Sequence, residues 1–112
     1  MIEKKNNIHT VLVTGGSGGL GSELADKISR HCKKIILLGK NKNSLFKIKK
    51  KLKKKHSSII YKIMDIDLSK KIGVQKAVKF VKKEKRVDVL INCAGNFSVK
   101  SIMNSSYKDL IS

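Results

Sequence analysis

The most constraining feature of the sequence is a glycine-rich stretch that directly follows a short apolar run. Residues 12–21 read L-V-T-G-G-S-G-G-L-G, so five of these ten positions are glycine. The apolar run at 9–14 is typical of a buried parallel strand, and from Leu20 onward small and apolar residues recur at helical spacing. A glycine cluster between a strand and a helix indicates that the backbone turns sharply and approaches another group closely.

The rest of the sequence repeats this alternation of apolar run and amphipathic segment. Apolar runs at 35–38, 59–64 and 87–91 predict three further strands. The intervening helices are predicted from apolar residues at helical spacing, namely Leu45, Ile48 and Leu52 in the first and Val74, Ala77, Val78 and Val81 in the second. Another helix is expected to begin at Ser105. The alternation predicts an α/β fold, a Rossmann-like doubly wound parallel sheet with about four strands in an incomplete three-layer αβα arrangement.

Length and composition restrict the class of protein. A chain of 112 residues fits one domain, so we predict a single domain over residues 1–112. The two cysteines, Cys32 and Cys93, match no metal-ligand spacing and are expected to be reduced thiols. No apolar run approaches the roughly 18 residues that cross a bilayer, and the N-terminus does not read as a secretory signal. We therefore predict a cytoplasmic protein that does not bind membranes.

The net charge of +18 comes from 24 lysines and only two arginines. Such a charge favours polyanions through counterion release, so nucleic acid must be considered as a partner. Arginine and interleaved aromatic residues, which nucleic-acid recognition uses, are scarce here. A nucleic-acid-binding protein is therefore the least favoured hypothesis. We attribute the lysines to compositional drift, a hypothesis that one continuous lysine stripe on the folded surface would contradict.

The position of the glycine-rich stretch, after a strand and before a helix, is typical of a dinucleotide-binding loop. Two registers fit the sequence: G-x-G-x-x-G on Gly16, Gly18 and Gly21, and T-G-x-x-x-G-x-G on Gly15, Gly19 and Gly21. In either register one glycine turns the chain, one admits the pyrophosphate, and Gly21 allows close packing of helix on strand. The N-terminus of the helix then offers N–H groups to the phosphates.

Two further motifs decide the register. Residues 92–95 read N-C-A-G after the fourth predicted strand, and residues 67–69 read D-L-S after the third. Together with T-G-G-S-G-G-L-G they make the chain resemble the short-chain dehydrogenase/reductase family from Val11 to Ser112. Cys93 departs from the family pattern, which usually has a second asparagine there. The resemblance favours the register Gly15, Gly19 and Gly21.

The resemblance also implies roles for individual residues. The phosphate and ribose loop would be formed by Gly15, Ser17, Gly18, Gly19, Leu20 and Gly21. Asp67, with Leu68, would contact the adenine, its carboxylate accepting a hydrogen bond from the exocyclic amine. The ribose on the nicotinamide side would be lined by Asn92, Ala94 and Gly95. Three alternatives stay open: Ser17 as a helix cap, Asp67 as a helix cap, and Asp65 in place of Asp67.

The end of the second predicted strand bears on which dinucleotide binds. A site for NAD needs a carboxylate there to accept from the ribose 2′-OH, but this position reads L-L-G-K-N-K. Gly39 replaces the acid, and Lys40 follows, with Lys42 or Ser44 nearby to meet a 2′-phosphate. NADP is therefore the predicted cofactor, and NAD is less favoured.

The chemistry that the resemblance implies is hydride transfer between NADP(H) and a small-molecule carbonyl or alcohol. The family uses a serine and a Tyr-x-x-x-Lys pair, and Tyr107 does not fit because Ile111 stands four residues later. We therefore expect an oxidoreductase represented by its cofactor-binding part, which is inactive alone and forms homo-oligomers, if at all, as the full-length protein. The alternative is a non-catalytic dinucleotide-binding module.

Overall fold

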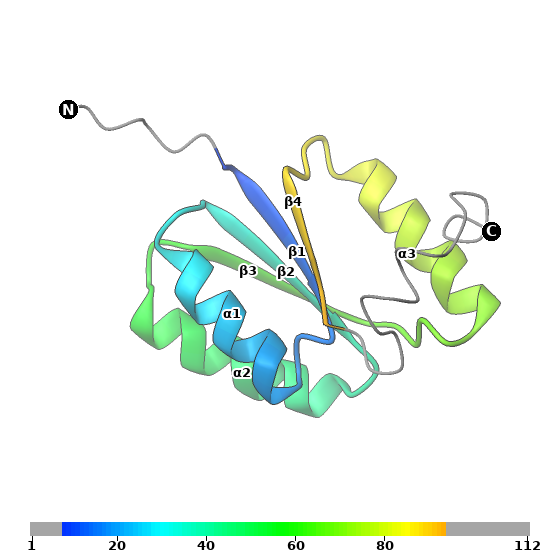
Figure 1. Ribbon diagram of the computed structural model, residues 1–112, viewed down its shortest axis with the longest axis horizontal. Coiled ribbons are helices and arrows are strands. Elements are labelled where there is room, and N and C mark those ends of the chain that lie inside the picture. The colour runs from blue at the N-terminus through cyan, green and yellow to red at the C-terminus, as the bar shows by residue number, and fades with distance from the viewer. Residues whose placement is uncertain (1–7, 94–112) are drawn as a thin grey trace.

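The computed structural model describes residues 8–93, in which four parallel strands carry helices on both faces (Figure 1). Along the chain the elements are β1 (Thr10–Thr14), α1 (Gly19–Ser29), β2 (Lys34–Gly39), α2 (Lys42–Lys55), β3 (Ile60–Asp65), α3 (Lys71–Lys83) and β4 (Val89–Asn92). The predicted Rossmann-like α/β fold is confirmed, and the predicted elements differ from the observed ones by one or two residues at strand ends. The helix expected from Ser105 lies outside the described residues.

The strand β1 lies inside the sheet, whose order is β3-β2-β1-β4. Val11 pairs with Ile35 of β2 on one side and with Val89 of β4 on the other. The chain therefore moves outward from β1 through β2 to β3 and then crosses back to the far side of β1. In open α/β sheets ligands bind where the chain reverses in this way, outside the carboxyl ends of the strands. Here that point lies between β1 and β4.

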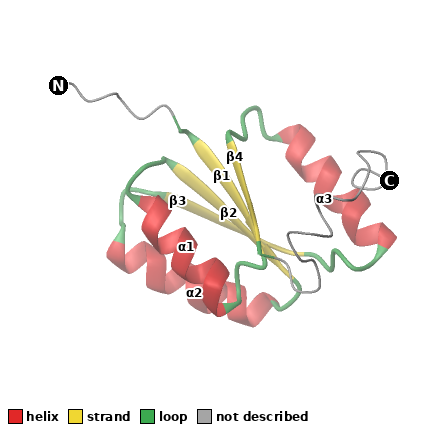
Figure 2. Ribbon diagram, in the orientation of Figure 1, coloured by secondary structure: helices red, strands yellow, loops and turns green. Residues whose placement is uncertain are grey.

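Each face of the sheet has its own apolar core, as alternation along the strands requires. Val11 and Val13 of β1 belong to the core that α1 and α2 cover, whereas Leu12 belongs to the core under α3. Figure 2 shows the helices in red on the two sides of the yellow sheet. The sequence had indicated continuous apolar runs, and β1 and most of β2 are indeed buried on both faces.

Two residues of the predicted helical faces lie elsewhere than expected. Val78 of α3 is 37% exposed, and Leu20 departs further. Leu20 is 64% exposed, and the buried side of α1 runs instead through Gly21, Ala25 and Ser29. Adjacent helical residues differ in direction by about 100°, so Leu20 turns away from the sheet when Gly21 faces it. Among residues 8–93, no helix is both long and apolar enough to cross a membrane.

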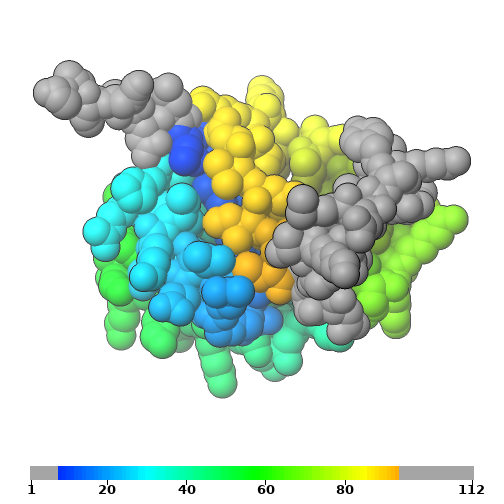
Figure 3. Space-filling model, in the orientation of Figure 1, coloured from blue at the N-terminus to red at the C-terminus, as the bar shows by residue number. Residues whose placement is uncertain are grey.

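The strand β4 lies at one edge of the described sheet and pairs within it with β1. Its Leu90 side chain faces the α3 side and is 60% exposed. Figure 3 shows the strand at the molecular surface beside α1, in yellow and orange. The described part of the chain therefore leaves apolar surface of β4 open.

A single carboxylate ties β4 to β1 at the opposite end of the strands. Asp88 Oδ2 accepts hydrogen bonds from the backbone N–H groups of His9 (2.7 Å) and Thr10 (3.1 Å). Arg86 Nε donates to Asp88 Oδ1 at 2.8 Å. The Arg86 guanidinium and these two N–H groups lower the pKa of Asp88 from 3.8 to about 2. Ionised Asp88 therefore stabilises the folded state.

We predict that Asp88→Asn lowers the urea midpoint of unfolding at pH 7. Because the folded pKa lies below the ordinary value of 3.8, the stabilisation by Asp88 is complete above that value and disappears as the pH falls through about 2. The difference in urea midpoint between the wild type and Asp88→Asn should therefore disappear as the pH falls from about 4 to about 2. Urea titrations across this range measure it, with Glu23→Gln as the control for loss of one negative charge. A difference in urea midpoint that stays constant with pH would contradict the role of Asp88.

Candidate dinucleotide site

The loops that carry the predicted binding residues meet at one edge of the sheet. All four strands are parallel, and Thr14, Gly39, Asp65 and Asn92 are their last residues. Thr14 pairs in register with Asn92, and Gly39 pairs with Asp65. The fold therefore brings together the segments that follow β1, β2 and β3 and the end of β4, although they are far apart in the sequence. Ala94 and Gly95, also predicted for this site, lie outside the described residues.

Three glycines of the loop after β1 have distinct structural tasks. Gly15 has φ 70°, a left-handed conformation that favours glycine. A Cβ on Gly21 would lie 2.2 Å from the carbonyl oxygen of Gly15, so only glycine lets the first turn of α1 pack against the loop. A Cβ on Gly19 would meet nothing within 4 Å, which leaves space for a ligand to approach that backbone. This geometry fits the register Gly15, Gly19 and Gly21.

The N-terminus of α1 is arranged to receive an anion. Its N-cap is Gly18, whose amide donates to Gly15 O at 3.1 Å. Within residues 8–93, no side chain caps this helix, and no acidic residue stands in its first turn. Ser17 therefore does not act as the cap. The N–H groups and positive dipole end of the first turn are thus available to a phosphate.

The end of β2 lies directly beside the glycine loop. Gly16 N donates to Leu38 O at 3.1 Å, and a Cβ on Gly39 would lie 3.3 Å from Ser17 Oγ. Gly39 is buried, whereas Lys40 is exposed. The charge of Lys40 contributes to lowering the pKa of Asp67, which places the lysine within electrostatic reach of the loop after β3.

Asp67 lies in the turn between β3 and α3, with its carboxylate held by Ser69. Asp67 Oδ1 accepts from Ser69 N at 2.9 Å and from Ser69 Oγ at 2.6 Å. These hydrogen bonds, followed by the charges of Lys40 and Lys70, lower the pKa of Asp67. The N-cap of α3 is Lys70, so Asp67 is not the cap residue of this helix. An ionised carboxylate therefore lies beside the end of β2.

The side chain of Asn92 has a structural task that the sequence did not reveal. Thr14 Oγ1 donates to Asn92 Oδ1, and Cys93 N donates to Thr14 O at 3.0 Å. These bonds join the carboxyl ends of β1 and β4 at the point where the chain direction reverses. The predicted ribose-lining role of Asn92 stays a prediction. Its amide oxygen already accepts a hydrogen bond from Thr14 Oγ1.

Gly73, in the first turn of α3, was not predicted from the sequence to have a role in this site. A Cβ there would lie 1.9 Å from the carbonyl oxygen of Asp67, so glycine is required for the observed packing. A glycine inside an otherwise helical pattern is the signal that could have drawn attention to this residue. The contact itself depends on how α3 folds back, which the local sequence does not give.

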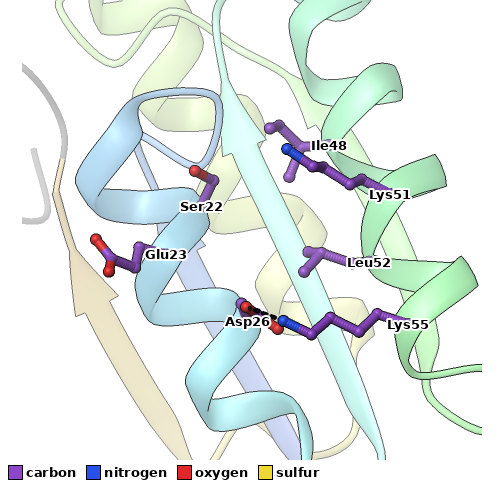
Figure 4. Close-up of a pocket in the computed structure, with 7 residues that line it drawn as sticks. All are labelled: Ser22, Glu23, Asp26, Ile48, Lys51, Leu52 and Lys55. Carbon is purple, nitrogen blue, oxygen red and sulfur yellow. Dashed lines mark hydrogen bonds and ion pairs between the residues drawn. The ribbon is translucent and has the colours of Figure 1, made fainter.

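A hollow of about 250 Å³ lies elsewhere, between α1 and α2 (Figure 4). It is lined by Ser22, Glu23, Asp26, Ile48, Lys51, Leu52 and Lys55. Asp26 forms an ion pair with Lys55 across it at 2.9 Å. None of the residues predicted to bind the dinucleotide lines this hollow, so it is separate from the candidate site.

The lysines are spread over both faces of the molecule. The exposed lysines of α2, including Lys47, Lys50 and Lys54, lie on one side of the sheet, and those of α3, including Lys76 and Lys79, belong to the helix on the other side. The described lysines therefore do not gather on one face of the sheet. This distribution agrees with the hypothesis that the charge reflects composition.

Comparison with known proteins gives a family match over nearly the whole chain. The family model for short chain dehydrogenase matches residues 9–111. A diacetyl reductase [(S)-acetoin forming] of Staphylococcus epidermidis is 31% identical over 103 residues, covering 90% of this chain and 39% of the relative. A 3-oxoacyl-[acyl-carrier-protein] reductase of Buchnera aphidicola is 33% identical over 108 residues, covering 96% of this chain and 41% of the relative. The chain thus spans about two fifths of the length of these relatives.

Solved structures share the fold. The L-sorbose reductase of Gluconobacter frateurii, complexed with NADPH and L-sorbose, has a TM-score of 0.72 at 24% identity, covering 95% of this chain and 41% of that one. A short-chain dehydrogenase of Sphingobium yanoikuyae in complex with NADPH has a TM-score of 0.72 at 22% identity, covering 85% and 40%. Together with the family match over residues 9–111, the sheet and its glycine loop lead to one conclusion: this chain belongs to the short-chain dehydrogenase family.

Proposed function

We propose that this chain binds NADP(H) at the carboxyl edge of its sheet. The observation that carries the proposal is the loop from Gly15 to Gly21, which ends at the uncapped N-terminus of α1 beside the end of β2. Backbone N–H groups there would hold the pyrophosphate, and the open surface over Gly19 would admit it without a steric clash. Asp67 would accept a hydrogen bond from the adenine amine.

The preference for NADP over NAD follows from the charges around the end of β2. The residue that would carry a carboxylate for the ribose 2′-OH is Gly39, and the next residue is the exposed Lys40. A 2′-phosphate would therefore meet an ammonium group and no repelling acid at that position. Ser17 Oγ lies beside Gly39 and offers a further hydrogen-bonding group.

The activity proposed for the whole protein is hydride transfer between NADP(H) and a small-molecule carbonyl or alcohol. The nicotinamide would supply or accept the hydride, and the residues described above would bind and orient it. Residues 1–112 contain no Tyr-x-x-x-Lys pattern. We propose that they bind the cofactor without turning over substrate, and that a longer protein of this family supplies the acid–base residues. The proposed location is the cytoplasm, where Cys32 and Cys93 would stay reduced.

We predict that the chain binds NADPH more tightly than NADH and that Lys40→Ala removes this preference. Loss of one charge-assisted contact to a phosphate should weaken NADPH binding roughly tenfold while NADH binding stays unchanged. Titrations followed by the fluorescence of the reduced nicotinamide measure both dissociation constants.

The matched control is Lys33→Ala, which removes an exposed lysine just before the opposite end of β2. It should leave both affinities unchanged, because it lies far from the carboxyl edge. Tighter binding of NADH than of NADPH by the wild type would contradict the proposed cofactor. An equal loss of NADPH affinity in Lys40→Ala and Lys33→Ala would mean that NADPH is held only by the general positive charge of the chain.

We further predict that Gly39→Asp reverses the cofactor preference. The new carboxylate would accept from the 2′-OH of NADH and repel the 2′-phosphate of NADPH. Its Cβ would lie 3.3 Å from Ser17 Oγ, a contact that a small shift of that side chain relieves. The same titrations test this, with Gly39→Asn as the uncharged control. If Gly39→Asp kept the preference for NADPH, the end of β2 would not be the ribose-selecting position.

A further inference from the structure

The turn before α3 fixes both the side chain and the backbone of Asp67. Ser69 donates two hydrogen bonds to the carboxylate, from its N–H at 2.9 Å and from its hydroxyl at 2.6 Å. Both bonds end on Oδ1, so neither uses Oδ2. The pair of bonds therefore holds the carboxylate in one orientation and leaves its second oxygen to accept from a ligand.

The backbone of Asp67 is held from both sides. Ile66 N donates to Gly39 O at 2.7 Å, which ties the preceding residue to the end of β2. Lys70 N donates to Asp67 O at 3.2 Å. Gly73 packs directly on the same peptide, since a Cβ there would lie 1.9 Å from Asp67 O and 2.8 Å from Asp67 C. Any larger residue at 73 must displace the backbone of Asp67.

Glycine inside a helix destabilises it relative to alanine. Gly73 lies in the first turn of α3 and is buried, although alanine would favour the helix more. A Cβ at this position would meet the Asp67 peptide most closely and would also come within 3.2 Å of Ile66 Cγ2. The same peptide carries the carboxylate that the proposed function assigns to the adenine.

We propose that Gly73 and Ser69 are positioning residues that aim Asp67 at the exocyclic amine of the adenine and thereby select a 6-aminopurine over a 6-oxopurine cofactor. This inference rests on the proposed function. An amine at that position of the purine donates to a carboxylate, whereas a carbonyl oxygen has no hydrogen to donate and is repelled. Selectivity between the two bases therefore reports where the carboxylate points.

The test compares the binding of NADPH with that of its deaminated analogue, in which hypoxanthine replaces adenine. The wild type should prefer NADPH by roughly tenfold, the scale of one hydrogen bond to a charged group. Gly73→Ala should reduce this ratio towards one, mainly by weakening NADPH. Gln75→Ala, an exposed change to alanine in the same helix, is the matched control and should keep the ratio.

A second pair of variants keeps the test valid if Gly73→Ala does not fold. Ser69→Ala removes the hydroxyl that holds Oδ1 and should lower the ratio, whereas Ser69→Thr keeps a hydroxyl and should restore it. Circular dichroism checks that each variant is folded. A general loss of structure would weaken both cofactors equally and leave the ratio unchanged.

The outcomes separate this inference from the function on which it rests. If the wild type binds neither compound, the proposed dinucleotide site is wrong. If it binds NADPH and the deaminated analogue equally, the dinucleotide site stands but Asp67 does not distinguish the two purines. The inference is then overturned. If Gly73→Ala and Ser69→Ala keep the full wild-type ratio, these residues only support the fold, which also overturns the inference.

Discussion

The rest of the structure depends on the close approach of the first turn of α1 to the end of β1. Gly21 lies so near the carbonyl oxygen of Gly15 that a Cβ would come within 2.2 Å of it. This contact fixes where α1 begins, and the left-handed turn at Gly15 makes it possible. The N-terminus of α1 is thereby placed above the carboxyl edge of the sheet, next to the ends of β2 and β4. One steric constraint thus creates both the start of the fold and the surface at which we propose that the dinucleotide phosphates bind.

We propose that charge adds selectivity to this surface. The chain is strongly basic as a whole, so any anion is attracted to much of its surface. A site can be selective only where charge and shape coincide. At the end of β2, Gly39 keeps the backbone close to Ser17, and Lys40 follows with its charge exposed. Across the edge, the Asp67 carboxylate is kept ionised by Ser69. Positive and negative groups are therefore both present, which suits a ligand with a phosphate at one end and an amine at the other.

Much of this architecture was predictable because its signals are local. The buried strands appear as apolar runs, and the glycine stretch between a strand and a helix marks the loop that we propose binds the dinucleotide. Contacts between distant segments were not predictable in the same way. The position of Asp88 against the N–H groups of His9 and Thr10 depends on β4 pairing with β1, which no local pattern gives. The bond from Thr14 to Asn92 arises from that same pairing.

The most direct test of the central claim is a map of where NADPH binds the folded chain. In an amide ¹H–¹⁵N NMR titration with NADPH, we expect the largest shifts at residues 15–21, with further shifts at Lys40 and Asp67. The exposed lysine face of α2 serves as the internal comparison, because it would attract any polyanion. Shifts concentrated at the carboxyl edge would support a dinucleotide site built by the glycine loop. Shifts centred on α2, with none at 15–21, would contradict it.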